Sequence, residues 1–134
     1  MRLGEYLSWA SEQPWGWGTN PGLDCCKFAG KWTIARGLID PMVLVWRNPY
    51  DSERSALRRI SEAGGLVPLW TAGMAHVGAD QIQDPIPGAI GVIQRETVCG
   101  LNEAAGIWTG LRWVTLGLRG LDFGPAEPLA MWRV

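Results

Sequence analysis

Apolar residues recur at helical spacing along the first half of the chain, and short strand-like segments separated by glycine and proline follow in the second half. The spacing predicts an amphipathic helix over residues 3–13 and a second helix from Cys25 to about Gly37, with Asp24 as its N-cap. Because the second helix carries a continuous apolar face, we expect it to lie at the centre of the core.

Two further helical segments are predicted before the strand region. Asp51 or Ser52 is positioned to cap a helix that ends at the glycine pair 64–65. The apolar segment 66–75 is expected to form one or two helical turns, and residues 39–50 are predicted to be irregular.

From Pro85 onward the pattern predicts four strands, at 89–94, 105–109, 113–116 and 130–134. Helices first and strands last indicate an α+β fold, with N-terminal helices packed on a C-terminal antiparallel sheet. We expect residues 1–134 to form a single domain around one core.

Charge is balanced, with 12 Lys and Arg residues against 13 Asp and Glu residues and a net charge of -1. This balance argues against nucleic acid or an anionic membrane as a partner. The sequence shows neither a signal-peptide pattern nor an apolar run of about 18 residues, so we expect no export signal and no membrane span.

Tryptophan is unusually frequent, with nine residues in a chain that is 47% hydrophobic and only 19% charged. Indole rings are enriched at protein interfaces, so an excess suggests that some are covered by other chains. The candidates for such contacts are Trp15, Trp17, Trp108 and Trp113. Ordinary core packing is the alternative for each of them.

The Gly- and Trp-rich segment 15–24 leads directly into Cys25, at the predicted start of a helix. The unpaired N–H groups and positive dipole of a helix N-terminus favour a thiolate, so Cys25 is the candidate nucleophile. The alternative is that Cys25 and Cys26 are small buried hydrophobic residues.

A reactive cysteine needs a base, and the chain has a single histidine, His76. His76 stands between small apolar residues, where a structural role is the alternative to service as that base. Three cysteines and one histidine without CxxC or HxxxH spacing predict no zinc site. The glycine-rich segments lack a phosphate-loop pattern, and we expect no cofactor.

A set of short motifs spans nearly the whole chain. They are Trp15, Trp17-Gly18, Asp24-Cys25, Asp40-Pro41, Arg47, Tyr50, Ala56-Leu57, Gly64-Gly65, Pro87-Gly88, Gly106-Ile107, Gly110 and Trp132-Arg133-Val134. In these motifs the chain resembles a phage and prophage family of uncharacterised domains that is related to the NlpC/P60 cysteine peptidases.

The resemblance implies a papain-like fold in which the helix starting at Cys25 packs on the sheet, with Cys25 at the nucleophile position. The Gly-Asp motif of those enzymes corresponds to Gly88-Ala89 here, and their histidine to Ala104 or Ala105. Only the cysteine is retained, and its remaining role is vestigial.

The resemblance therefore predicts a structural protein of a tailed-phage particle, made in the host cytoplasm and placed in the virion at the tail tip, baseplate or hub. Its expected partners are other tail or hub proteins, with self-association and peptidoglycan as further partners. One alternative is an active peptidoglycan endopeptidase or amidase that uses Cys25 with His76 or a partner's base. The other is a tail-assembly factor absent from the mature virion.

Overall fold

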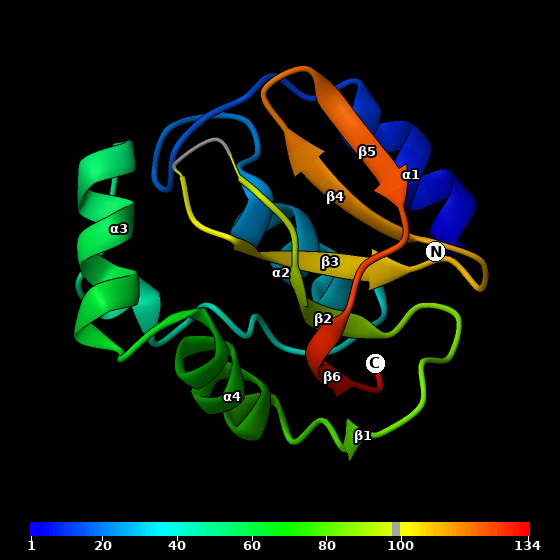
Figure 1. Ribbon diagram of the computed structural model, residues 1–134. Helices are drawn as coiled ribbons and strands as arrows, with labels where there is room; N and C mark the ends of the chain where they lie inside the picture. Colours follow the sequence, from blue (N-terminus) through cyan, green and yellow to red (C-terminus); the bar gives the residue numbers. More distant parts are fainter. Residues whose placement is uncertain (98–99) are drawn as a thin grey trace.

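The computed structural model describes residues 1–97 and 100–134, and within them an α+β arrangement of four α-helices and a six-stranded antiparallel sheet (Figure 1). The helices are α1 (Leu3–Ser11), α2 (Cys25–Ala35), α3 (Glu53–Glu62) and α4 (Leu66–Val77), with a short 3-10 helix η1 (Val45–Arg47). The strands are β1 (Gln81–Ile82), β2 (Ile90–Gln94), β3 (Glu103–Trp108), β4 (Trp113–Gly117), β5 (Gly120–Gly124) and β6 (Pro128–Trp132).

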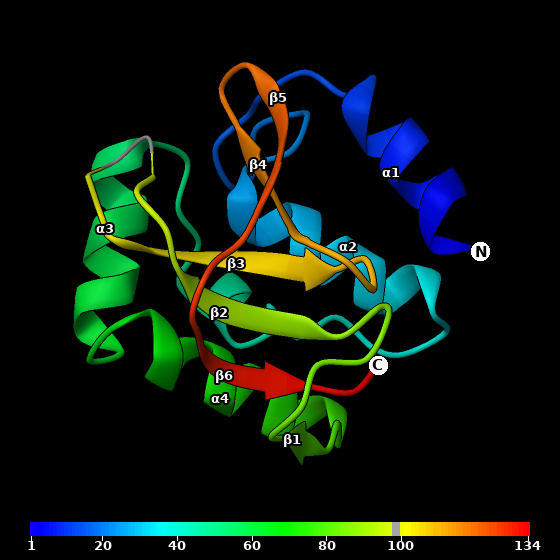
Figure 2. The ribbon, with the colours of Figure 1, turned by 45° about the vertical axis from the view of Figure 1, so that its right-hand side comes forward.

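The strand order across the sheet is β1-β6-β2-β3-β4-β5, and every neighbouring pair is antiparallel. Helix α2 packs against β3 and β4, whereas α4 packs against β2, β3 and β6. Figure 2 shows β3, β2 and β6 lying side by side in front of α2 and α4, while the β4–β5 hairpin bends away from them. The sheet therefore curves around the start of α2.

Helix α2 is the centre of the core, as its apolar face predicts. Phe28 and Ala29 are fully buried, and Trp32 is 2% exposed. The indole N–H of Trp32 donates to the carbonyl of Gly88 at 2.8 Å, which joins the helix to the start of the sheet. Tyr6 of α1 packs on Trp32 with 5.3 Å between ring centroids and donates its hydroxyl to the carbonyl of Phe28. Burial raises the pKa of Tyr6 well above its usual range.

The predicted helices are confirmed, but α4 is longer than expected and runs from Leu66 to Val77. Pro68 does not interrupt it, because Pro68 lies in the first turn, where backbone N–H groups have no acceptor within the helix. The helix ends at Gly78, which adopts a left-handed conformation with φ of +79°.

All four predicted strands are present, whereas β1 and β5 were not predicted. Both are edge strands, and β5 buries none of its residues fully. Strand β5 forms because its backbone pairs with β4 through a tight hairpin, in which Gly117 opposes Gly120. Because β5 buries neither face fully, its sequence lacks the alternation of apolar and polar residues by which a strand is predicted.

Trp113 is a core residue, which favours ordinary core packing, the alternative to contact with another chain. It is 2% exposed and lies over Gly91 of β2, where an added Cβ would come within 2.6 Å of its ring. Its cross-strand neighbour Trp108 is half-buried, with 5.3 Å between the two ring centroids. Trp108 therefore keeps surface that a partner could cover, and Trp113 does not.

No helix within residues 1–97 and 100–134 combines the length and the apolar character that crossing a membrane requires.

Packing of Trp113 on Gly91 predicts an unequal response to two glycine substitutions. Gly91→Ala should lower the free energy of unfolding by about 1–3 kcal/mol, because the indole ring must shift. Gly4→Ala, at an open position in α1, should instead raise it by about 0.5–1 kcal/mol. Urea denaturation measures both values, and a neutral Gly91→Ala variant would contradict this packing.

Candidate functional site

The start of α2 is organised by Asp24, whose side chain is almost completely buried. One carboxylate oxygen accepts the backbone N–H of Lys27 at 2.8 Å, which confirms Asp24 as the N-cap. The other accepts the backbone N–H of Gly18 at 2.9 Å and the hydroxyl of Tyr50 at 2.5 Å. Burial raises the pKa of Tyr50, with the nearby Cys26 and Asp24 adding to the effect. One carboxylate thus joins the loop, the helix and the segment after η1.

The loop before α2 folds tightly because glycine occupies its close contacts. A Cβ on Gly18, which has φ of +54°, would lie 1.9 Å from the carbonyl oxygen of Tyr50. A Cβ on Gly16 would lie 1.7 Å from the carbonyl oxygen of Pro21. The indoles of Trp15 and Trp17 meet edge to face, with ring centroids 5.1 Å apart. The loop therefore holds two tryptophans in a fixed arrangement.

The two adjacent cysteines have different surroundings. Cys25 is the first residue of α2 and is half-buried, whereas Cys26 is 8% exposed. A hydrogen bond with Cys25 and burial raise the pKa of the Cys26 thiol well above its usual range. Cys26 is consequently held as a neutral thiol, and Cys25 is the more accessible sulfur.

Cys25 borders two small cavities, and a different tryptophan lines each. The first, of about 60 Å³, is lined by Trp15 and by residues of the sheet that include Ala104 and Thr115. The second, of about 30 Å³, is lined by Trp17 and by apolar residues of α3 and α4. The paired indoles of Trp15 and Trp17 therefore each line one of the two cavities that Cys25 borders.

His76 is not brought to Cys25. It is exposed in the last turn of α4 and lines neither of the cavities that Cys25 borders. The opposite end of the same helix, at Leu66 and Leu69, lines the cavity beside the cysteines. The described lining of both cavities thus carries no imidazole.

Two carboxylates, those of Glu96 and Asp122, line the cavity of about 60 Å³ that Cys25 borders on the side of the sheet. Both side chains belong to exposed residues. The described lining of this cavity therefore provides a sulfur and two carboxylates, but no imidazole.

Arg95, at the end of β2, fixes the outer part of the sheet next to this cavity. Its guanidinium donates to the hydroxyl of Thr115 at 3.1 Å and to the carbonyls of Asp122 and Gly124 at 3.1 and 3.0 Å. These contacts link β2 to β4 and β5 across 20 to 29 residues of sequence. No local pattern predicts them, because the partners lie on β4 and β5, far from Arg95 in the sequence.

Within the described residues, no group of three or more His, Cys, Asp or Glu side chains is arranged to hold a metal ion. The third cysteine, Cys99, lies outside the described residues.

The chain belongs to the family described as Domain of unknown function (DUF6950), whose family model matches residues 1–134. No curated protein and no solved structure is significantly similar to it.

The three hydrogen bonds to Asp24 predict that its loss is more costly than the loss of a surface cap. Asp24→Ala should lower the free energy of unfolding by about 2–5 kcal/mol, because buried donors on Gly18 and Tyr50 lose their acceptor. Ser52→Ala, which removes the N-cap of α3, should cost about 1 kcal/mol. Equal losses in thermal or urea unfolding would contradict a central role for Asp24.

The raised pKa of Cys26 predicts selective alkylation of its neighbour. In a Cys99→Ser background, iodoacetamide at about pH 8 should modify Cys25 at least about tenfold faster than Cys26, because the thiolate is the reactive form. Tandem mass spectrometry of the peptide that contains both residues locates the label. Faster labelling of Cys26 would show that its sulfur is neither buried nor held as a thiol.

Proposed function

We propose that this chain is a non-catalytic structural component of a tailed-phage particle, at the tail tip, baseplate or hub, built on a degenerate cysteine-peptidase fold. One observation carries the proposal. Cys25 stands at the start of the central helix beside a cavity whose described lining contains no imidazole. Placement in the virion rests on the resemblance to phage and prophage domains.

The alanines of β3 bear on the proposed descent from a cysteine peptidase. The resemblance places the missing histidine at Ala104 or Ala105, and both are buried in β3, which packs against α2. Ala105 belongs to the core cluster against which Cys25 packs, whereas Ala104, which also lines the cavity of about 60 Å³ beside Cys25, belongs to the separate cluster of Trp113. At either position the side chain is a methyl group, which cannot act as a base.

Loss of the base removes most of the expected catalysis. A positioned acid–base residue typically contributes a factor of about 10²–10⁴ in rate, and it also protonates the leaving group. Glu96 and Asp122 line the cavity beside Cys25, but both are exposed residues, and no hydrogen bond joins either carboxylate to the sulfur within the described residues. The fold is then retained for its shape and contacts.

The surface around the cysteine supports a role in binding other proteins. Trp15 and Trp17 are half-buried, so each leaves indole surface that a partner could cover. Trp108 offers further indole surface. We propose tail or hub proteins as the partners, with self-association and peptidoglycan as further ones.

The rival function is an active peptidoglycan endopeptidase or amidase with Cys25 as nucleophile. The observation in its favour is that Glu96 and Asp122 share the cavity with Cys25, and a partner could supply a base. A third proposal is a tail-assembly factor that is absent from the mature virion.

Substitution of the sulfur separates these functions. Phage carrying Cys25→Ala should assemble with an unchanged titre, and the wild-type protein should release no more peptide from peptidoglycan than the variant. The physical reason is that a thiol without a base contributes little to hydrolysis. Plaque assays and chromatography of digested peptidoglycan measure the two outcomes.

Cys26→Ala is the matched control, since it removes a neighbouring sulfur that lies deeper in the core. Wild-type hydrolysis that disappears only in Cys25→Ala would establish the enzyme and refute the structural proposal. Mass spectrometry of purified particles should detect the chain at a fixed copy number, whereas its absence would indicate an assembly factor.

A further inference from the structure

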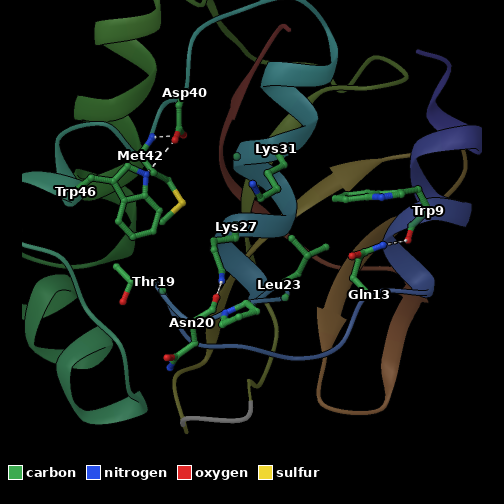
Figure 3. A pocket seen from close by; sticks show the side chains of 14 residues that line it. Trp9, Gln13, Thr19, Asn20, Leu23, Lys27, Lys31, Asp40, Met42 and Trp46 are labelled. Atoms are coloured by element: carbon green, nitrogen blue, oxygen red, sulfur yellow. Dashed lines mark hydrogen bonds between the residues drawn. The ribbon is translucent and has the colours of Figure 1, made fainter.

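A groove of about 500 Å³ lies between α1, α2 and the segment 40–46. Figure 3 shows Trp46 on one side of this groove and Trp9 on the other, with Lys27 and Lys31 of α2 between them. Neither indole belongs to the cysteine site, and Cys25 does not line the groove. The size falls within the range of about 300–1,000 Å³ that is typical of small-ligand sites.

The chain contains only two lysines, and both line this groove. They are four residues apart on α2, where like charges destabilise a helix by about 0.2–0.5 kcal/mol. Neither Lys27 nor Lys31 forms an ion pair within residues 1–97 and 100–134. The other ten basic residues of the 12 are arginines, and none of them lines the groove. Both lysines of the chain thus line this groove, and neither ammonium group has a carboxylate partner among the described ion pairs.

Lys27 is a buried cation with donors to spare. Its residue is 6% exposed, and its ammonium makes one hydrogen bond in the described chain, to the carbonyl of Asn20 at 2.9 Å. Burial lowers the pKa of Lys27, Lys31 lowers it further, and the nearby Asp24 opposes both effects. A bound anion would stabilise this charge directly.

The acid that lines the groove, Asp40, does not neutralise the lysines. One of its oxygens accepts the backbone N–H of Met42 at 2.9 Å, and the other accepts the indole N–H of Trp46 at 3.0 Å. Its carboxylate therefore fixes the position of Trp46. The lining keeps an excess of one positive charge, from two lysines against one aspartate.

Both indoles are held in place by tyrosines. Trp46 stacks on Tyr50 with 5.7 Å between ring centroids and 17° between the planes. Trp9 packs on Tyr6 at 5.5 Å and is still 38% exposed. Rings that are already ordered lose little conformational entropy when a ligand stacks on them.

We propose that this groove binds an acidic saccharide, with pyranose rings against Trp9 and Trp46 and a carboxylate or phosphate on Lys27 and Lys31. The apolar faces of a sugar ring suit the negative face of an indole, and its charged group suits the ammonium groups. Hydroxyls would reach Gln13, Thr19 and Asn20, which also line the groove. The site is independent of the role of Cys25.

Other ligand classes fit less well. Two lysines cannot follow the backbone of a polynucleotide, whose affinity depends on many phosphate contacts. No strand of the described sheet lines the groove, so a peptide cannot bind there by extending the sheet. The lysines also make the groove unsuited to the apolar face of an amphipathic helix.

Calorimetry at low salt tests the proposal on the full chain. The probes are a tetrasaccharide of alternating glucuronate and N-acetylglucosamine, glucose 1-phosphate, neutral chitotetraose and tetraglutamate. We expect at least one acidic sugar to bind with a dissociation constant of about 1 mM or lower, and the two neutral or peptidic probes to bind at least about tenfold more weakly. Comparison of glucose 1-phosphate with free glucuronate, which also has a single ring, shows whether carboxylate or phosphate is the preferred anion.

Variants place the binding in the groove. Lys31→Met and Trp9→Ala, both at exposed positions, should each weaken binding by at least about tenfold. Arg58→Met, on the exposed surface of α3, is the matched control and should leave affinity within about twofold. Circular dichroism checks that each variant is folded.

A second measurement follows the lysines themselves. Reductive methylation with isotope-labelled formaldehyde gives NMR signals for the two lysines and the N-terminus, and the lysine signals should shift saturably with the acidic sugar. The proposal is wrong if neither acidic sugar binds at about 10 mM, if tetraglutamate or chitotetraose binds equally well, or if Lys31→Met and Trp9→Ala bind normally.

Discussion

The Asp24 carboxylate receives hydrogen bonds from the Gly- and Trp-rich loop, from the first turn of α2 and from Tyr50. Because it is buried, each of these donors would be left without water if the carboxylate were lost. The same contact therefore fixes the start of the central helix, the path of the loop and the segment that carries Tyr50. The cysteine site and the lysine groove both lie against elements that this one side chain holds together.

Helix α2 presents different chemistry to its different neighbours. Its first residue, Cys25, borders cavities closed by the sheet and by two indoles from the loop. Two and six residues later, Lys27 and Lys31 line the groove that α1 and the segment 40–46 complete. The apolar face between them is buried in the core, so the two sites share a rigid support, and Met42 is the residue that lines both. A substitution in one site can therefore remove its proposed role and leave the other site intact.

The outer part of the sheet closes the cysteine cavity through long-range contacts. Arg95 connects the end of β2 to β4 and β5, and this brings Asp122 to the same cavity as Ala104. Under the proposed descent from a cysteine peptidase, strand β3 carries alanine where the base would stand. The described lining of this cavity holds a sulfur and two carboxylates, but no imidazole.

Local spacing in the sequence determined the four helices, four of the six described strands, the cap at Asp24 and hence the α+β class, because each depends on neighbours only a few residues away. The tertiary structure alone decided that β5 forms, that Trp113 is buried and that His76 lies away from Cys25. It also decided that both lysines line one groove with indoles from two other segments. These outcomes depend on which distant segments of the chain pack together, and the local pattern of residues does not specify that packing.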